Sequence, residues 1–356
     1  EFRDEHLTQT RTEIDRLAMA ISSTLNDSQA SGLDLNSLQG ANIFTDINST
    51  QLQQGRSLAH SSNTGNTQVQ ITITDVSTLS TDEFEVRFDG PNFTLYNLTS
   101  GATSDLGLPG SGTPAGTHTA SPNVGFSFVE TNATLPSVPV AGDTFSIIPT
   151  KNSAALMEAT LKDGSAIAAS SAIAVTASTN NVSNGKVEIT NVTNPVAAEA
   201  YELTVDVYES PPPAIPGASF DYRIYDPASP TPAAPLLTGT YASGATAIVD
   251  IPSGSPDFQI EISGDLFGSG ANAREKFSLG SAFGVGNGNH AVAMAKTQEV
   301  GITNGGKETF SKSLAVSTSV VGSKASNANL TADTAQALFT QAYNRNQSTS
   351  GVNLDE

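Results

Sequence analysis

The sequence predicts an α+β protein of several domains, in which both chain ends form one coiled-coil-like helical domain and two mainly antiparallel β domains are inserted between them. Apolar residues recur every seven positions near both ends, which is typical of packed helices. Apolar and polar residues alternate through the middle, which is typical of half-buried strands. The length of 356 residues is enough for about two or three domains.

The first predicted helix carries an apolar stripe at Leu7, Ile14 and Ile21, which are seven residues apart. It is expected to end between residues 26 and 32, where Asn, Ser and Gly accumulate. Residues 33–36 then predict a compact loop anchored by leucine side chains.

A second, much longer helix is predicted from Thr309 to about Asn346. Its seven-residue repeat consists of Leu314, Val321, Ala328, Ala335 and Ala342. Phe310, Leu338 and Phe339 widen this stripe. We expect Leu7, Ile14, Ile21, Leu314 and Val321 to form a seam between the two helices.

A shorter helix is predicted from His290 to about Gln298, after a glycine-rich stretch in which Asn287 or Asn289 can cap it. Residues 154–161 predict one more short helix.

Strands are predicted wherever the apolar period is two. They cover residues 69–73, 84–88, 93–95, 124–130, 144–148, 187–190, 201–208, 220–225, 247–251 and 258–262. Proline clusters at 211–216 and 227–235 are interpreted as exposed loops of a β domain.

A faint internal repeat accompanies these strands, although such short matches also arise by chance. Phe126, Phe128, Phe145 and Ser146 recur at one constant offset as Phe258, Ile260, Phe277 and Ser278. The two β domains are therefore candidates for the same arrangement of strands.

The order of elements predicts discontinuous domains. Residues 1–62 and 286–356 are assigned to the helical domain, 63–173 to a first β domain, and 174–285 to an outer β domain. Residues 256–285 have two possible assignments, the outer β domain or the first β domain.

Composition excludes several function classes. The net charge is −19 and no basic cluster is interleaved with aromatic residues, so nucleic-acid binding is not expected. Cysteine is absent, which removes disulfides, thiolate metal sites and cysteine nucleophiles. The longest apolar runs are far below the ~20 residues that a bilayer span needs, so no membrane partner is expected.

No catalytic, cofactor-binding or metal-binding residue is predicted. His6, His60, His118 and His290 are scattered, and surface or capping roles suit them better than metal binding. The glycines at 284–288 lack the dinucleotide fingerprint and are assigned to helix entry. Asp82, Glu83 and Glu85 lack the spacing of a calcium loop and are assigned to a solvated strand start.

Several segments resemble the flagellar axial proteins, most closely the hook-associated protein 1 family. Residues 350–356 resemble the signature that precedes the terminal helix of these proteins. Other matching segments are 2–5, 17–18, 26 and 32–36 for the inner helix, and 75, 82–90 and 142–150 for the first outer domain. Residues 288–291 stand where the family usually has an Asp-Asn-x-Asn-Ala pattern, and the likeness is weak at 174–255.

The resemblance implies a non-enzymatic structural adaptor between the flagellar hook and filament, which is exported through the flagellar type III channel. It implies four partners: copies of itself in a helical layer, hook protein, the next junction protein, and an export chaperone that binds a terminal helix. Because Asp355 and Glu356 look like the first turn of another helix, we expect a core fragment of a longer protein.

Two alternatives stay open. The first is another axial protein, such as hook protein or flagellin. The second is a secreted adhesive β module or a polysaccharide-acting enzyme on a helical stalk, against which the scarcity of aromatic residues argues.

Overall fold

The computed structural model describes residues 8–131, 138–209, 218–228, 235–266 and 274–350. They fall into two compact units. The first unit draws on Glu1–Ile21, Ile47–Leu156 and Gln298–Glu356, and the second on Ser22–Asp46 and Met157–Thr297. The domain limits expected from the sequence remain a prediction.

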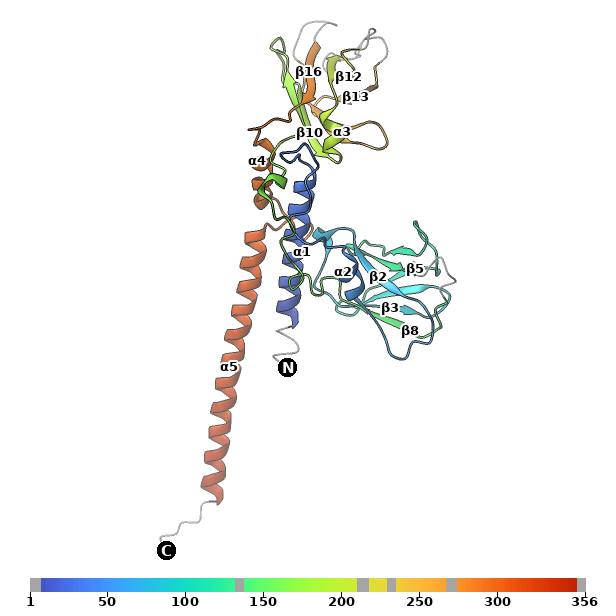
Figure 1. Cartoon of the computed structure of the whole chain (residues 1–356). Helices are drawn as coiled ribbons and strands as arrows, with labels where there is room; N and C mark the ends of the chain where they lie inside the picture. Colours follow the sequence, from blue (N-terminus) through green and yellow to red (C-terminus); the bar gives the residue numbers. More distant parts are fainter. Residues whose placement is uncertain (1–7, 132–137, 210–217, 229–234, 267–273, 351–356) are drawn as a thin grey trace. The chain divides into compact units, whose positions relative to one another are not determined.

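Three of the predicted helices are confirmed, at Thr8–Ala30, Asn289–Lys296 and Phe310–Ser350 (Figure 1), whereas two short helices, Thr50–Gly55 and Pro195–Glu199, were not predicted. The helices are α1 (Thr8–Ala30), α2 (Thr50–Gly55), α3 (Pro195–Glu199), α4 (Asn289–Lys296) and α5 (Phe310–Ser350), with 3-10 turns at Val76–Thr78, Gly164–Ala166 and Thr297–Glu299. The short helix predicted at residues 154–161 is wrong, because this stretch forms turns and the Ala154 N–H donates to Asp15 at 2.8 Å.

The first unit contains a β-sandwich of two antiparallel sheets. Its five-stranded sheet has the order β1 (Ser57–Ala59), β8 (Asp143–Ile147), β3 (Phe84–Phe88), β4 (Phe93–Asn97), β5 (Thr103–Gly107). Its three-stranded sheet has the order β2 (Val69–Ile73), β7 (Phe126–Glu130), β6 (Thr117–Thr119). Alternate residues of both sheets meet in one core, in which Ile71, Val86, Phe93 and Phe128 are almost fully buried.

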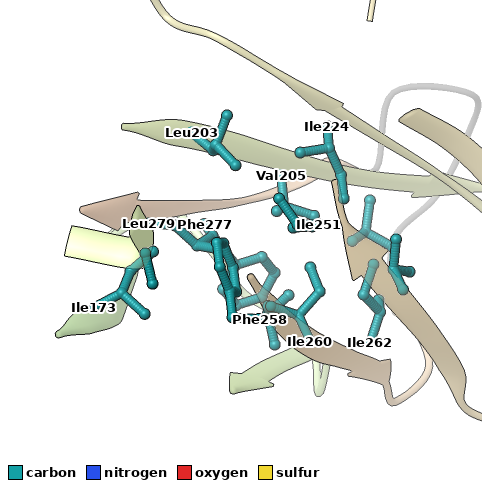
Figure 2. Packing of buried hydrophobic residues seen from close by; sticks show 14 of the residues in the cluster. Ile173, Leu203, Val205, Ile224, Ile251, Phe258, Ile260, Ile262, Phe277 and Leu279 are labelled. Carbon is teal, nitrogen blue, oxygen red and sulfur yellow. The ribbon is translucent and has the colours of Figure 1, made fainter. Parts of the chain in front are cut away.

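The second unit contains a β-sandwich of the same composition. Its five-stranded sheet has the order β13 (Leu237–Ala242), β12 (Ser219–Tyr225), β11 (Leu203–Glu209), β16 (Arg274–Ser281), β9 (Ile173–Ala177). Its three-stranded sheet has the order β10 (Lys186–Val192), β15 (Phe258–Ser263), β14 (Ala247–Ile251). Figure 2 shows Val205, Phe258, Ile260 and Phe277 packed in its core.

The two sandwiches have identical topology, so the internal repeat is confirmed. Every strand of the second sandwich occupies the place of the strand numbered eight lower in the first, and all six pairings within each sandwich are reproduced. In the shared register Phe145 pairs with Val86, and Phe277 pairs with Val205. The Phe-rich match seen in the sequence therefore marks equivalent core strands.

An asparagine side chain ties the loop after the first strand of each repeat to the last strand. Asn63 accepts from the Thr144 N–H at 2.9 Å and donates to its carbonyl at 2.8 Å. Asn181 makes the same two bonds to the backbone of Lys276, both at 2.9 Å.

A buried carboxylate sits one residue before each of these contacts. Asp143 accepts from the backbone N–H groups of Thr64 and Gly65 at 2.9 and 3.1 Å. Glu275 accepts from those of Val182 and Ser183 at 2.9 and 2.8 Å. Because equivalent side chains satisfy equivalent loop amides, these contacts belong to the shared plan of the sandwich.

The strands that the sequence did not predict are mainly edge strands. These are β1, β5, β6, β9 and β13, each at the border of a sheet, together with the interior strand β16. An edge strand buries fewer side chains and needs less apolar alternation, so its pattern is weak. Both β15 and β16 pair with strands of the second unit.

His118 corrects the sequence interpretation, because it lies in β6 with its ring fully buried rather than in an exposed loop. Its Nε2 lies 2.8 Å from the carboxylate of Glu130, and its Nδ1 lies 2.8 Å from the carbonyl oxygen of Leu106. In the second sandwich the equivalent positions hold Val249 and Ile262, which are also buried. The same sandwich can therefore be built with an apolar pair at this place.

We expect His118→Val or Glu130→Ile alone to destabilise the first unit by about 3–5 kcal/mol. The first change leaves the buried Glu130 without its histidine, and the second leaves His118 and the Gly110 N–H without their acceptor. The double variant H118V/E130I should be more stable than either single variant, because it adopts the pair that the second sandwich uses. Hydrogen exchange of the β7 amides in increasing urea measures the local free energy of opening. A double variant as unstable as the sum of the singles would contradict this expectation.

Candidate assembly surface

Helix α5 gives the first unit a long exposed surface. Figure 1 shows α5 as one continuous helix. It is 41 residues long, and every described side chain beyond Lys324 is exposed. The exposed large apolar side chains on it are Leu314, Val316, Val320, Val321, Leu330, Leu338, Phe339 and Tyr343. Phe339 stacks on Tyr343 one turn away, with ring centroids 6.3 Å apart. A helix with this much exposed apolar surface is typical of an interaction element.

A narrow groove lies between the first turns of α5 and helix α1 in this unit. On α1 it is lined by Thr10, Glu13 and Arg16, and on α5 by Ser313, Val316, Ser317, Val320, Val321 and Lys324, with Glu308 at its edge. Its solvent volume is about 110 Å³. Polar side chains from α1 thus face a mixture of valine, serine and lysine side chains from α5.

The predicted seam between the two helices is wrong within the described residues. Ile14 and Leu314 are each more than half exposed, and Val321, which is 41% exposed, lines the groove. Leu7 lies outside the described residues. The heptad pattern identified the helices correctly but not the face that is buried.

Helix α1 buries a mixed face whose members include Asp15, Ser22 and Gln29, again seven residues apart. Within the first unit Met19 joins the core of the β-sandwich, and Arg16 donates to the carbonyl of Leu79 at 3.5 Å. The helix therefore packs on loops and strands, whose backbone groups need polar partners.

In the second unit two buried amide side chains of α1 hold neighbouring loops. Asn26 donates to the carbonyl of Phe44 and accepts from its N–H, both at 2.9 Å. Gln29 donates to the carbonyl of Ala166 at 2.7 Å and accepts from the Ala168 N–H at 3.2 Å. Sequence reasoning missed these residues, although their spacing along one helical face was a usable signal.

His290, at the start of α4, is also buried, which corrects the surface role expected for it. Its Nε2 lies 2.8 Å from the Ser28 carbonyl oxygen, and a Cβ added at Gly32 would lie 2.2 Å from its ring. Burial lowers the pKa of His290, and the bond to the Ser28 carbonyl opposes this shift only in part. The N-cap of α4 is Gly288, and Asn287 accepts from the Asn289 N–H at 2.9 Å.

A second groove, of about 390 Å³, opens beside α4. It is bordered by the loop at residues 33–35, the turn at 164–170 and the glycine-rich loop at 283–288. Leu35, Ile167 and Val285 project there as exposed apolar side chains. The glycines at 284–288 thus lie in a loop that leads into α4, which is the helix-entry role assigned to them from the sequence.

The described side chains contain no cluster of three or more His, Asp or Glu that could hold a metal ion. His60 is exposed and lies 2.7 Å from the Ser62 hydroxyl. None of the helices in the described part of the chain combines the length and apolar character that a membrane span requires.

Comparison with known proteins finds similarity to flagellar hook-associated proteins. Residues 1–44 match the family described as "Flagellar hook-associated protein FlgK helical domain". A stretch of 170 residues is 25% identical to "Flagellar hook-associated protein 1" of Escherichia coli (strain K12), and it covers 48% of this chain and 28% of that protein.

The solved structure of the flagellar hook junction protein FlgK from Burkholderia pseudomallei has the same fold. The likeness has a TM-score of 0.65 at 20% sequence identity, and it covers 98% of this chain and 61% of that one. The predicted α+β multidomain fold is therefore confirmed. These relatives carry the name hook-associated protein 1 or FlgK, which agrees with the resemblance seen in the sequence.

We expect Gln29→Leu to destabilise the second unit by about 2–4 kcal/mol, because it leaves the Ala166 carbonyl and the Ala168 N–H buried without a partner. Gln51→Leu makes the same substitution at an exposed position of α2 in the first unit, and it should change the stability of either unit little. Equilibrium urea unfolding measures both. Equal losses in the two variants would show that the bonds of Gln29 have no special role.

The stability of the second unit should fall as the pH drops below about 6.5, the ordinary pKa of histidine in an unfolded chain. Above that pH His290 is neutral in both states, whereas below it the unfolded chain takes up a proton that the folded unit resists. His290→Gln keeps a donor for Ser28 and should flatten the melting temperature between pH 7.5 and 5.5. His60→Gln, at an exposed histidine, should leave the pH dependence as it is.

Proposed function

We propose that this chain is part of a structural adaptor that joins hook to filament in the bacterial flagellum and assembles as a helical layer through its helical segments. The proposal is supported mainly by α5, whose long exposed apolar surface suits lateral and axial contacts between subunits. The similarity to hook-associated protein 1 agrees with it. The matched segment amounts to 28% of the E. coli relative, so the partners and the place of action belong to the proposal as well.

The partners proposed are copies of the same chain, hook protein on one side, and the next junction protein on the other. An export chaperone is expected to bind terminal helices before assembly. The place of action is extracellular, after export through the flagellar channel. Two subunit types with different interfaces can be joined by a layer whose two faces differ, which is a mechanical rather than a catalytic task.

The alternatives differ in what they require of the surface. Another axial protein, such as hook protein or flagellin, would use the same helices, but the comparisons match hook-associated protein 1. An adhesive β module on a stalk would not require the distal part of α5 to be apolar. The behaviour of that helix in the cell therefore discriminates between them.

Deletion of the gene should abolish motility and release filament subunits unattached into the medium, and the unchanged gene should restore assembly. The variant L338D/F339D should fail to restore it, because two charges on the apolar face of α5 oppose burial against a neighbour. T340D/N344D adds the same charge to the opposite side of the helix and should retain more motility. Swimming in soft agar and immunoblots of shed filament protein are the readouts. Normal motility with L338D/F339D would contradict the proposal.

A further inference from the structure

The outward face of the five-stranded sheet in the second unit carries a group of cationic and aromatic side chains on three neighbouring strands. The core of this unit uses alternate residues such as Val205, Ile224 and Phe277, so the residues between them point away from it. This group, called the arginine–tyrosine face, consists of Tyr208, Arg223, Tyr225, Arg274 and Lys276.

One buried carboxylate organises this face. Asp206 is 1% exposed and accepts from Arg223 through Nε at 3.0 Å and Nη2 at 2.7 Å. The Tyr225 hydroxyl donates to the other oxygen at 3.3 Å, and Nη1 of Arg274 lies 3.6 Å away. Because one fixed anion holds three side chains, their geometry is set before any partner arrives.

The two guanidinium groups keep capacity for a further partner. The Arg274 side chain is 48% exposed and lies 5.3 Å from the centre of the Tyr208 ring, on which Arg223 also rests at 5.9 Å. The Asp206 bonds occupy only two of the five N–H donors of Arg223. Arginines held rigidly beside tyrosine are the residue types that dominate binding energy at protein interfaces.

The internal repeat shows that the sandwich does not need this face. In the first sandwich the positions of Arg223, Arg274 and Lys276 are taken by Thr94, Gly142 and Thr144. The strand pairing is the same in both sandwiches. The sandwich topology therefore does not require Arg274 and Lys276, whereas Arg223 compensates the buried charge of Asp206.

The equivalent face of the first sandwich has the opposite charge character. Glu85, Asp89 and Asp105 lie there beside a single cation, Arg87, which pairs with Glu85. This group is called the acidic face. With a net charge of −19, copies of the chain repel one another unless contacts pair carboxylates with its few cations.

We propose that the arginine–tyrosine face of one copy docks on the acidic face of the first sandwich in a second copy. The contact is heterologous, because each copy offers a different face, and repeated contacts of this kind generate rings or helical layers. The inference rests on the proposed function, which supplies an assembly of identical copies. It adds a β-sandwich contact to the helical contacts of α5.

The test places the photoreactive residue p-benzoylphenylalanine at position 208 in the chromosomal gene (Tyr208→p-benzoylphenylalanine). Irradiation of isolated flagella should yield a dimer of this protein, with the cross-linked peptide of the second copy within residues 84–107. A cross-link to another protein, to another region of the second copy, or none in flagella that contain the protein overturns the inference. If the protein is absent from isolated flagella altogether, the result contradicts the proposed function, on which this inference rests.

Charge variants in the same background test the chemistry of the contact. R274Q/K276Q should lower the dimer yield roughly fivefold, because two partly exposed ion pairs are lost. K162Q/K186Q makes the same change of net charge at exposed positions elsewhere in the second unit and should leave the yield unchanged. Equal yields in the two variants would also overturn the inference. A thermal melt of each variant verifies that it is folded.

Discussion

Buried polar side chains that satisfy loop backbone groups are the constraint on which the rest of this structure depends. The chain has no disulfides and few aromatic residues, and long loops connect short strands. Asp143 and Glu275 bind consecutive loop amides, while Asn26 and Gln29 bind loop backbone from helix α1. Without such partners, each buried N–H or carbonyl would cost more than the surrounding apolar contacts return.

The duplication of the sandwich separates what the fold requires from what it tolerates. The asparagine clamp and the buried carboxylate are present in both copies, whereas the His118–Glu130 pair of one is Val249 and Ile262 in the other. The outward sheet faces have diverged further, one toward acidic and one toward cationic side chains. A repeated domain that keeps its internal contacts while its surface residues change can bind different partners on the same scaffold.

Helix α5 has a different relation to stability. Most of its described side chains are exposed, so its apolar residues bury little surface within the folded chain itself. Helices of this kind gain their stability from packing against other helices. This agrees with the proposal that α5 is stabilised by packing against other copies in an assembly.

Local patterns were sufficient to identify the long elements and the class of fold. The seven-residue spacing marked α1 and α5, the period of two marked most interior strands, and the matched Phe residues marked the repeated sandwich, because each pattern is a property of one segment. The short, polar edge strands escaped detection, since their pairing comes from a neighbouring strand and not from their own side chains.

The buried face of α1, the enclosure of His118 and His290, and the clustering of Arg223, Arg274 and Tyr208 were settled only in three dimensions. Each depends on residues that are far apart in sequence, such as Gln29 and Ala166, or Asp206 and Arg274. A heptad repeat predicts that one face of a helix is buried, but it does not identify the residues against which that face packs. When a helix packs against loop backbone, the buried N–H and carbonyl groups of the loop need hydrogen-bond partners. Polar residues therefore occupy the buried positions of the helix.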